Sequence, residues 1–205
     1  MFISFEGIDG CGKTTQLHLL NDYLTKLGHS VVAVREPGGT QISENIRKIL
    51  LDDENNISAT AELLLFEAAR AELTNTIIEP ALKKNNIVLS DRFIDSTLAY
   101  QGYGRELDID AIKKLNDIAT HKITPDITFY FQLQLEIAKQ RFSKNNLDRM
   151  ELSGDIFLQK VIDGFDTIAL NNPIRIVVID GSATIDDVFK KIIDELTNRK
   201  LFYSI

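Results

Sequence analysis

The stretch FISFEGIDGCGKTT, residues 2–15, decides the fold of this chain. An apolar run meets a segment rich in glycine, and a lysine and two threonines follow at once. Gly7, Gly12, Lys13 and Thr14 fill the fixed positions of the pattern G-x-x-x-x-G-K-[ST]. The apolar run before the pattern predicts a strand, and the leucine-rich segment after it predicts a helix. That context is typical of a phosphate-binding loop.

The composition of this loop has a physical explanation. Glycine lets the backbone approach a ligand closely, because it has no Cβ in the way. Consecutive backbone N–H groups then form a cradle for an anion, and the positive end of the following helix strengthens it. Lys13 can reach the outer phosphates, and the hydroxyl of Thr14 suits Mg²⁺. The loop alone does not choose between a GTPase, an ATP-driven machine and a small-molecule kinase.

Length, charge and patterning narrow the class of protein. A chain of 205 residues is long enough for one domain with a sizeable core and short for two. A net charge of −7 argues against a general nucleic-acid-binding surface. No apolar run approaches the roughly 20 residues that span a bilayer, and residues 1–7 lack the basic start of a signal peptide. We therefore expect a cytoplasmic protein with neither a membrane nor a nucleic acid as its partner.

The single cysteine, Cys11, lies inside the glycine-rich loop. It cannot form an intrachain disulfide, which agrees with a reducing compartment. It is either a reactive thiol or a small side chain that fills a tight loop, and we favour the second interpretation.

Short β-like runs alternate with longer helical patterns along the chain. The predicted strands are rich in Ile, Val and Phe and nearly continuous in apolar residues, as expected for strands buried on both faces. They are residues 2–5, 31–35, 87–90, 127–131 and 174–179. This order predicts an α/β fold of three layers, the P-loop NTPase fold, with a five-stranded parallel sheet and helices on both faces. The whole chain, 1–205, is expected to form one domain.

Three helical segments stand out. Residues 15–28 place Leu17, Leu20, Leu24 and Leu27 on one face and end at a glycine, a plausible cap. Residues 60–85 form a second long candidate, in which Pro80 kinks the helix or starts a new segment. Residues 186–200 close the chain with helical spacing. The polar stretch 145–154 is interpreted as a mobile loop between helices, although a plain surface connector fits its composition equally well.

The rest of the chain narrows the choice left open by the loop. A regulatory GTPase carries a guanine-selecting N-K-x-D motif, and this sequence has none; the nearest look-alike is KNNLD at 144–148. A motor ATPase usually needs more chain. A small-molecule kinase is therefore favoured, and a nucleotide-binding switch without turnover remains the alternative.

A second polar site follows the apolar strand NIVLSDRF, residues 86–93. Asp91 lies at the carboxyl end of this strand, where a carboxylate that organises Mg²⁺ belongs. Arg92 would stand at the same mouth and could grip a phosphate with its two-pronged guanidinium. A purely structural Asp–Arg ion pair is the alternative.

Uncharged donors, acceptors and rings follow this site. Such an inventory suits a nucleobase and its sugar, although these residues could instead cap and face a surface helix. They are Ser96, Thr97, Tyr100, Gln101 and Tyr103.

Further candidates for an acceptor site lie upstream. Phe66 and Arg70 share a helix face and could stack on a base and hold its phosphate, although a core Phe with a solvated Arg is the simpler interpretation. Glu36, in the turn REPGGT, is a candidate contact to the acceptor. Arg47, on the next helix, faces either the same cleft or solvent.

Taken together, these motifs resemble those of the bacterial thymidylate kinases. They occur in the family's order, and REPGGT followed by DRxxxSxxAYQG is far more specific than the P-loop. The motifs are EGIDGCGKTT, REPGGT, LLFEAAR, SDRFIDSTLAYQGYGR, TPDITFYF and DRME. The resemblance implies transfer of the γ-phosphoryl of ATP to dTMP, with Mg²⁺ as the cofactor.

The resemblance also implies a role for each matching residue. Phe66 would stack on thymine, and Ser96, Thr97 and Gln101 would read the edge of the base. Arg92 would grip the 5′-phosphate, and Tyr100 would pack against the deoxyribose. The metal would be held through Thr14 with Asp91 nearby. The implied ATP-binding residues are Gly7, Ile8, Asp9, Gly10, Cys11, Gly12, Lys13 and Thr14. The implied dTMP-binding residues are Asp9, Glu36, Arg47, Phe66, Arg70, Arg92, Ser96, Thr97, Tyr100 and Gln101.

Asp9 matches an acidic position that accepts a hydrogen bond from the 3′-hydroxyl of the nucleotide. Some members of the family carry an arginine one place later, where this chain has Gly10. The missing cation is then expected from a lid at about 141–154, which offers Arg141, Lys144 and Arg149. These three, with Lys13, Asp9 and Arg92, are the expected catalytic residues. The family also implies a homodimer.

Overall fold

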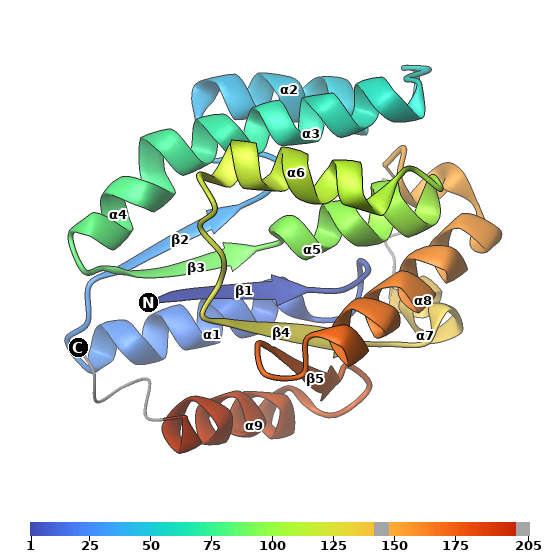
Figure 1. The fold of residues 1–205 in the computed structure, drawn as a ribbon. Coiled ribbons are helices and arrows are strands. Elements are labelled where there is room, and N and C mark those ends of the chain that lie inside the picture. Colours follow the sequence, from blue (N-terminus) through green and yellow to red (C-terminus); the bar gives the residue numbers. More distant parts are fainter. Residues whose placement is uncertain (142–147, 200–205) are drawn as a thin grey trace.

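The computed structural model describes residues 1–141 and 148–199. Within them, five parallel strands form one sheet in the order β2-β3-β1-β4-β5, with β1 at its centre (Figure 1). The strands are β1 Phe2–Glu6, β2 Val31–Arg35, β3 Ile87–Asp91, β4 Ile127–Gln132 and β5 Ile176–Asp180. This confirms the predicted α/β fold and its five-stranded parallel sheet.

The register brings the carboxyl ends of three strands to one edge. Phe5 of β1 and Arg35 of β2 both lie opposite Asp91 of β3. Residues that directly follow β1, β2 and β3 therefore meet at this edge, where open parallel sheets usually carry their ligands.

One face of the sheet is covered by α1 (Lys13–Lys26) and α9 (Ile185–Asn198), which contact each other. The apolar residues of this face, such as Ile3, Phe5 and Leu89, share one core cluster with the leucines of α1. Burying this leucine stripe supplies most of the reason for α1 to form, because isolated helices of its length are marginal in water.

The opposite face carries the remaining helices (Figure 1). Tyr130 of β4 stacks on Phe165 of α8, with ring centroids 5.2 Å apart. On the same face α4 packs against β3, and α3 packs against α2 and α6. The helices described here are α2 Gln41–Leu51, α3 Ala59–Leu73, α4 Glu79–Lys83, α5 Ile94–Thr97, α6 Ile109–Thr120, α7 Leu135–Arg141 and α8 Asp155–Asn171.

Wider and tighter helical turns join several of these helices. The π-helical turn η1, Thr74–Ile78, carries α3 into α4, and the π-helical segment η2, Leu98–Gly104, continues α5. A short 3₁₀ turn, η3, spans Glu151–Ser153. Within the described residues, no helix is long and apolar enough to cross a membrane.

A buried ion pair anchors α5, which carries two of the candidate site residues. Arg175, just before β5, donates to both oxygens of Asp95 at 2.7 Å, and Asp95 is fully buried. Arg175 also donates to Thr128 of β4 at 2.8 Å. The start of α5 is thereby tied to the sheet by charge-assisted hydrogen bonds, which are stronger than neutral ones.

The structure corrects some predicted boundaries. The last strand begins at Ile176 and not at residue 174: Ile174 is 87% exposed and lies in a turn, because the Arg175 and Ile176 amides both bond to Asn172 O. Leu27 is exposed and follows the end of α1, so it does not belong to the buried face of that helix. The predicted helix 60–85 consists of three successive segments, and Pro80 lies in the first turn of the last, as expected.

Two further predictions of organisation can be compared with the described residues. The helix predicted over 186–200 is α9, which ends at Asn198. The polar stretch does connect two helices, α7 and α8, although its residues 145–147 lie outside the described residues.

Candidate functional site

The loop between β1 and α1 has the backbone of an anion cradle. Gly7 has a φ of 138°, and a Cβ there would lie 2.8 Å from Phe131 O, so only glycine fits. Gly12 has a φ of 98° directly before α1. No side chain caps the first amides of α1. These N–H groups, at the positive end of the helix, are left for an anion.

Lys13 and Cys11 are two buried side chains of the loop. Lys13 is buried, and its Nζ donates to Ile8 O at 2.8 Å. Cys11 is buried in the core, and burial raises the pKa of its thiol. Cys11 is therefore a filler and not a reactive thiol, as the sequence indicated.

An ion pair joins this loop to β3. Arg92 Nη2 donates to Asp9 Oδ1 at 2.7 Å, and Arg92 Nη1 donates to Gly7 O at 2.9 Å. Burial alone would raise the pKa of Asp9, but the charges of Arg92 and Lys13 outweigh it and hold that pKa well below its usual range. Arg92 itself has a φ of 72°, a conformation that non-glycine residues rarely adopt and that concentrates at functional sites.

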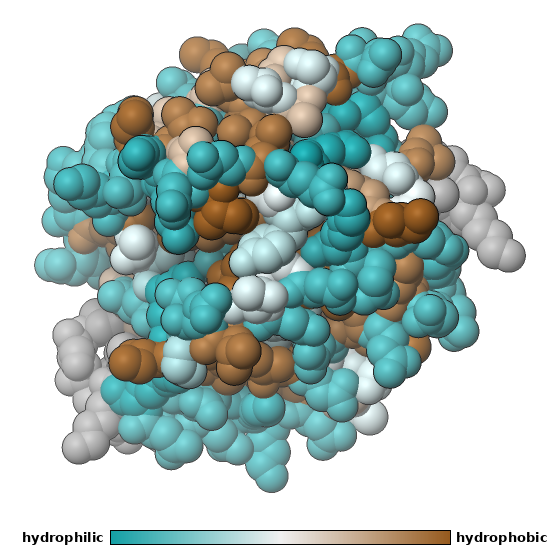
Figure 2. Space-filling model, turned by 45° about the vertical axis from the view of Figure 1, so that its right-hand side comes forward, coloured by the Kyte–Doolittle hydropathy of each residue, from teal (hydrophilic) through white to brown (hydrophobic). Residues whose placement is uncertain are grey.

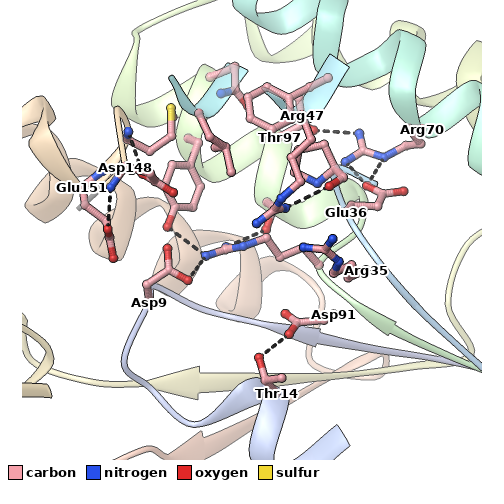
Figure 3. A pocket seen from close by; sticks show the side chains of 18 residues that line it. Asp9, Thr14, Arg35, Glu36, Arg47, Arg70, Asp91, Thr97, Asp148 and Glu151 are labelled. Atoms are coloured by element: carbon pink, nitrogen blue, oxygen red, sulfur yellow. Dashed lines mark hydrogen bonds and ion pairs between the residues drawn. The ribbon is translucent and has the colours of Figure 1, made fainter. Parts of the chain in front are cut away.

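The two candidate metal ligands are in contact. Thr14 Oγ1, in the first turn of α1, donates to Asp91 Oδ2 at 2.5 Å (Figure 3). Among the described residues there is no cluster of three or more His, Cys, Asp or Glu that could hold a metal alone. One hydroxyl and one carboxylate at a phosphate-binding loop fit Mg²⁺, which is usually held by one or two protein oxygens together with substrate phosphates.

A pocket of about 310 Å³ opens beside the Asp9–Arg92 pair. All ten predicted dTMP-binding residues line it, although they come from the P-loop and from segments around β2, α2, α3, β3 and η2. Its lining is Asp9, Thr14, Arg35, Glu36, Pro37, Arg47, Leu51, Phe66, Arg70, Asp91, Arg92, Ser96, Thr97, Tyr100, Gln101, Asp148, Met150 and Glu151.

Arg70 forms part of the pocket wall and is 2% exposed. Its guanidinium donates to Glu36, Glu67, Thr97 and Asn116 at 2.7–2.8 Å and to Phe93 O at 3.0 Å. Nη1 makes three of these contacts with its two N–H groups, and Nη2 also pairs with Glu36 Oε2 at 2.7 Å, so every N–H group of Arg70 already has a contact. The predicted contact of Arg70 with a base or phosphate therefore requires one of these contacts to be exchanged.

Glu36 pairs with Arg70 through one carboxylate oxygen, and its other carboxylate oxygen accepts no hydrogen bond among the described residues. Oε2 accepts from Arg70, whereas Oε1 is buried and has no partner among the described residues. Burial raises the pKa of Glu36 to about 6, against the lowering effect of Arg70. A buried acceptor that lines the pocket and lacks a donor is suited to a ligand's hydroxyl or N–H group.

Arg47 and Arg35 give this rim of the pocket a positive charge. Arg47 Nη1 donates to Pro37 O at 2.9 Å, and burial together with the nearby Arg35 lowers its pKa. Arg35 bonds both oxygens of Glu44 at 3.0 Å and is half exposed. The sequence interpretation missed Arg35, although its position at the end of β2 could have indicated it.

The three predicted base-reading residues are each held by another side chain. Ser96 Oγ donates to Glu6 at 2.6 Å, Thr97 Oγ1 accepts from Arg70 at 2.7 Å, and Gln101 Nε2 donates to Glu62 at 2.9 Å. Tyr100 lies under Arg92, whose guanidinium carbon is 5.1 Å from the ring centroid.

Two buried acids that the sequence interpretation missed therefore support the pocket. Glu6, at the end of β1, accepts from Phe93 N and Ser96 Oγ, and burial together with Asp95 raises its pKa to about 8. Glu62 lies in the apolar segment AELLLF, one helical turn before Phe66. A charged residue inside such a segment was the signal that could have found it.

The predicted lid cations differ in where they lie. Arg141, at the end of α7, donates to Gly10 O at 3.2 Å and to Gly181 O at 2.9 Å, so it contacts the loop between β1 and α1. Arg149 donates to Leu50 O at 2.8 Å and to Glu62 at 2.6 Å, on the far side of the pocket. Lys144 and most of the first half of the predicted lid, 141–154, lie outside the described residues.

Comparison with known proteins agrees with this geometry. A family model described as Thymidylate kinase matches residues 5–192. The thymidylate kinase of Chlorobaculum tepidum is 47% identical over 206 residues and 96% of each chain is covered. That of Thermosipho africanus is 48% identical, with 94% of this chain and 95% of the relative covered.

A solved structure extends the likeness to three dimensions. The crystal structure of thymidylate kinase from Ehrlichia chaffeensis aligns with a TM-score of 0.80 at 42% identity, covering 96% of this chain and 98% of the other. The chain therefore belongs to the thymidylate kinase family, the enzymes that phosphorylate dTMP to dTDP with ATP.

Proposed function

We propose that this chain transfers the γ-phosphoryl of ATP to dTMP by holding ATP on the loop Gly7–Thr14 and dTMP in the adjoining pocket. The observation that carries this assignment is the 2.7 Å pair between Asp9 and Arg92. Asp9 belongs to the donor loop and Arg92 to the acceptor pocket, so the two sites share a boundary. A donor and an acceptor phosphate bound on either side of that boundary would be neighbours.

Charge repulsion between the two phosphates is the main obstacle to the reaction. Both substrates are anionic, and catalysis of phosphoryl transfer rests largely on positioning and on charge neutralisation. Lys13 on the donor side and Arg92 on the acceptor side supply fixed positive charge. The acceptor phosphate is already ionised near neutral pH, so no strong general base is needed. Asp9, whose pKa is depressed, is a positioning group for the acceptor sugar.

Mg²⁺ fits this scheme through Thr14 and Asp91. The two oxygens face each other at 2.5 Å and could bind the ion directly or through water. When bound with ATP, the ion would neutralise charge on the transferred phosphoryl.

Arg141 is the best-supported candidate for the cation that replaces the arginine which some family members carry at the position of Gly10. It donates to the carbonyl of Gly10 itself. Arg149 instead bonds a buried carboxylate and a helix carbonyl, which suits an anchor. The role of Lys144 stays a prediction, as does the extent of the lid.

A homodimer is supported by exposed apolar residues on the outer helices. Ile42 and Ile49 of α2, Leu64 of α3 and Ile118 of α6 are 47–71% exposed. Brown patches lie among hydrophilic residues at the top of the molecule in Figure 2, where α2 and α3 lie in Figure 1. Exposed apolar patches of this kind mark protein–protein contacts. The free, buried Cys11 agrees with a cytoplasmic location, where thiols stay reduced.

The acceptor is tested with purified protein, ATP, Mg²⁺ and a panel of nucleoside monophosphates, with ADP formation as the readout. We expect the highest kcat/KM with dTMP. Faster turnover of dCMP or of a purine monophosphate would show that the pocket has been assigned to the wrong base. ADP formation that needs no acceptor would favour a nucleotide-binding switch.

A further inference from the structure

Glu62 is a buried acid outside the reacting centre. It lies in the first turn of α3 and its side chain is fully buried. Phe66, on the same helix face four residues later, lines the pocket. An ionised carboxylate in such a place is costly unless it is fully hydrogen-bonded, so its partners indicate what it does.

Those partners occupy all the acceptor positions of the Glu62 carboxylate. Oε1 accepts from Gln101 Nε2 at 2.9 Å and from Arg105 Nε at 3.1 Å. Oε2 accepts from Arg105 Nη2 at 3.1 Å and from Arg149 Nη1 at 2.6 Å. A carboxylate offers about four acceptor positions, and all four are used. Burial alone would raise the pKa of Glu62, but hydrogen bonds from Arg105 and Gln101 outweigh it, and the net shift is downward.

An ionised Glu62 can only accept hydrogen bonds, so the amide of Gln101 must turn its NH₂ group toward it. The carbonyl oxygen of Gln101 then lies on the other side of the amide. Among the described residues, that oxygen has no hydrogen-bond donor, and Gln101 lines the pocket. Ser96 and Thr97, by contrast, already bond Glu6 and Arg70.

We infer that Glu62 is a positioning residue that selects the base, because it fixes the Gln101 amide with its acceptor oxygen available to the pocket. A thymine or uracil ring presents an N–H group at its N3 position, which matches a free acceptor. A cytosine ring presents a lone pair at N3. This acceptor would face the acceptor oxygen of Gln101, and no hydrogen bond could form. This inference rests on the proposed function and on the use of Gln101 to read the base.

The same carboxylate also holds the segment that closes one side of the pocket. Arg149 bonds Glu62, and Arg105 donates to Ser153 Oγ at 3.0 Å as well as to Glu62. Met150 and Glu151, between these anchors, line the pocket. Glu62 thus fixes the base-reading amide and this wall together.

The test is Glu62→Gln, measured as the ratio of kcat/KM for dTMP to that for dCMP. The new amide can donate as well as accept, so the Gln101 amide is free to turn over. We expect the ratio to fall at least about tenfold, since leaving one buried polar group unpaired costs about that much. The change should come from a lower kcat/KM for dTMP and a gain with dCMP.

The double variant Glu62→Gln with Gln101→Glu sharpens the test. Its new amide donates to a carboxylate at 101, which again presents only acceptors to the pocket. We expect the preference for dTMP to recover in the double variant relative to Glu62→Gln alone. If Glu62→Gln does not fold, the ratio of kcat/KM for dTMP to that for dCMP is compared between the double variant and Gln101→Leu. We expect the higher ratio in the double variant, because Gln101→Leu has no acceptor at position 101.

Asp166→Asn is the matched control. Asp166 accepts from the amide of Gln132 at 2.8 Å, which makes it a carboxylate–amide pair of the same chemistry outside this pocket. We expect a loss of stability without a change in the dTMP to dCMP ratio. A ratio in Glu62→Gln equal to that of wild type would overturn the inference while the proposed function stands. Failure of the wild type to prefer dTMP would overturn the proposed function first.

Discussion

The donor loop and the acceptor pocket are built in opposite ways. The loop is eight consecutive residues, Gly7–Thr14, and its proposed role in binding ATP rests on backbone amides and glycine conformations. The pocket gathers side chains from the P-loop and several other segments, and buried acids hold several of them in place, among them Arg70, Ser96 and Gln101. The loop is therefore encoded locally, whereas the pocket depends on the whole fold. Substitutions in the loop and substitutions in the pocket should therefore alter different properties of the protein.

The largest effect is expected on the donor side. Lys13→Ala removes the cation that is proposed to contact the outer phosphates and should lower kcat by about 10²–10³-fold or more, the usual cost of one such electrostatic group. The affinity for dTMP should change little, because Lys13 does not line the pocket. Steady-state kinetics and dTMP titration measure both, with Lys26→Ala as the control. Unchanged turnover in Lys13→Ala would contradict the assignment of Gly7–Thr14 as the loop that binds ATP.

The next largest effect is expected on the acceptor side. Arg92→Lys keeps a charge but loses the planar fork that bonds Asp9 and Gly7 O. We expect kcat/KM for dTMP to fall about 100-fold while the KM for ATP stays within about threefold. Arg199→Lys, on the surface beyond α9, is the control. An equal rise of both KM values would contradict the separation of the two sites.

Glu36 links the stability of the pocket to pH. Its pKa is about 6 in the folded chain and 4.5 in the unfolded reference. Between these values the unfolded chain releases the proton first, so a rise in pH favours unfolding. The free energy of unfolding should fall by about 2 kcal/mol across that window, and Glu36→Gln should remove the fall. Denaturant unfolding of both proteins from pH 4 to 7 measures it, and identical pH profiles would rule the effect out.

The smallest effect is expected where the two sites meet. Asp9→Asn removes the proposed contact to the 3′-hydroxyl, so turnover of dTMP should fall about tenfold. Turnover of the 3′-deoxy analogue, which lacks that hydroxyl, should fall less. Equal losses with both substrates would argue that Asp9 serves only to hold Arg92.

The same contrast explains what could be predicted from the sequence. The loop and the five strands follow from contiguous patterns, and they were located to within one or two residues. Ten of the residues lining the pocket were predicted through motif resemblance, whereas Arg35 was missed. Their partners were not, because Glu62 lies 39 positions from Gln101 and 87 from Arg149. Such pairs exist only once the helices are layered on the sheet.

The boundary errors have local causes. Ile174 continues the apolar pattern of β5, but the chain turns at Asn172 and Arg175 bonds Asp95. The strand therefore begins two residues later, at Ile176. Leu27 fits the helical spacing of α1, but the helix ends one residue earlier. Periodicity alone cannot detect either event, because both depend on where the chain must turn.

The most direct test of the account is a calorimetric titration of dTMP in the absence of ATP. The pocket is held together by internal ion pairs and needs no ATP to form. We therefore predict that wild type and Lys13→Ala bind dTMP with affinities within about threefold of each other, and that wild type binds dCMP at least about tenfold more weakly. Binding of ATP without any binding of dTMP would contradict the account and point to a nucleotide switch instead.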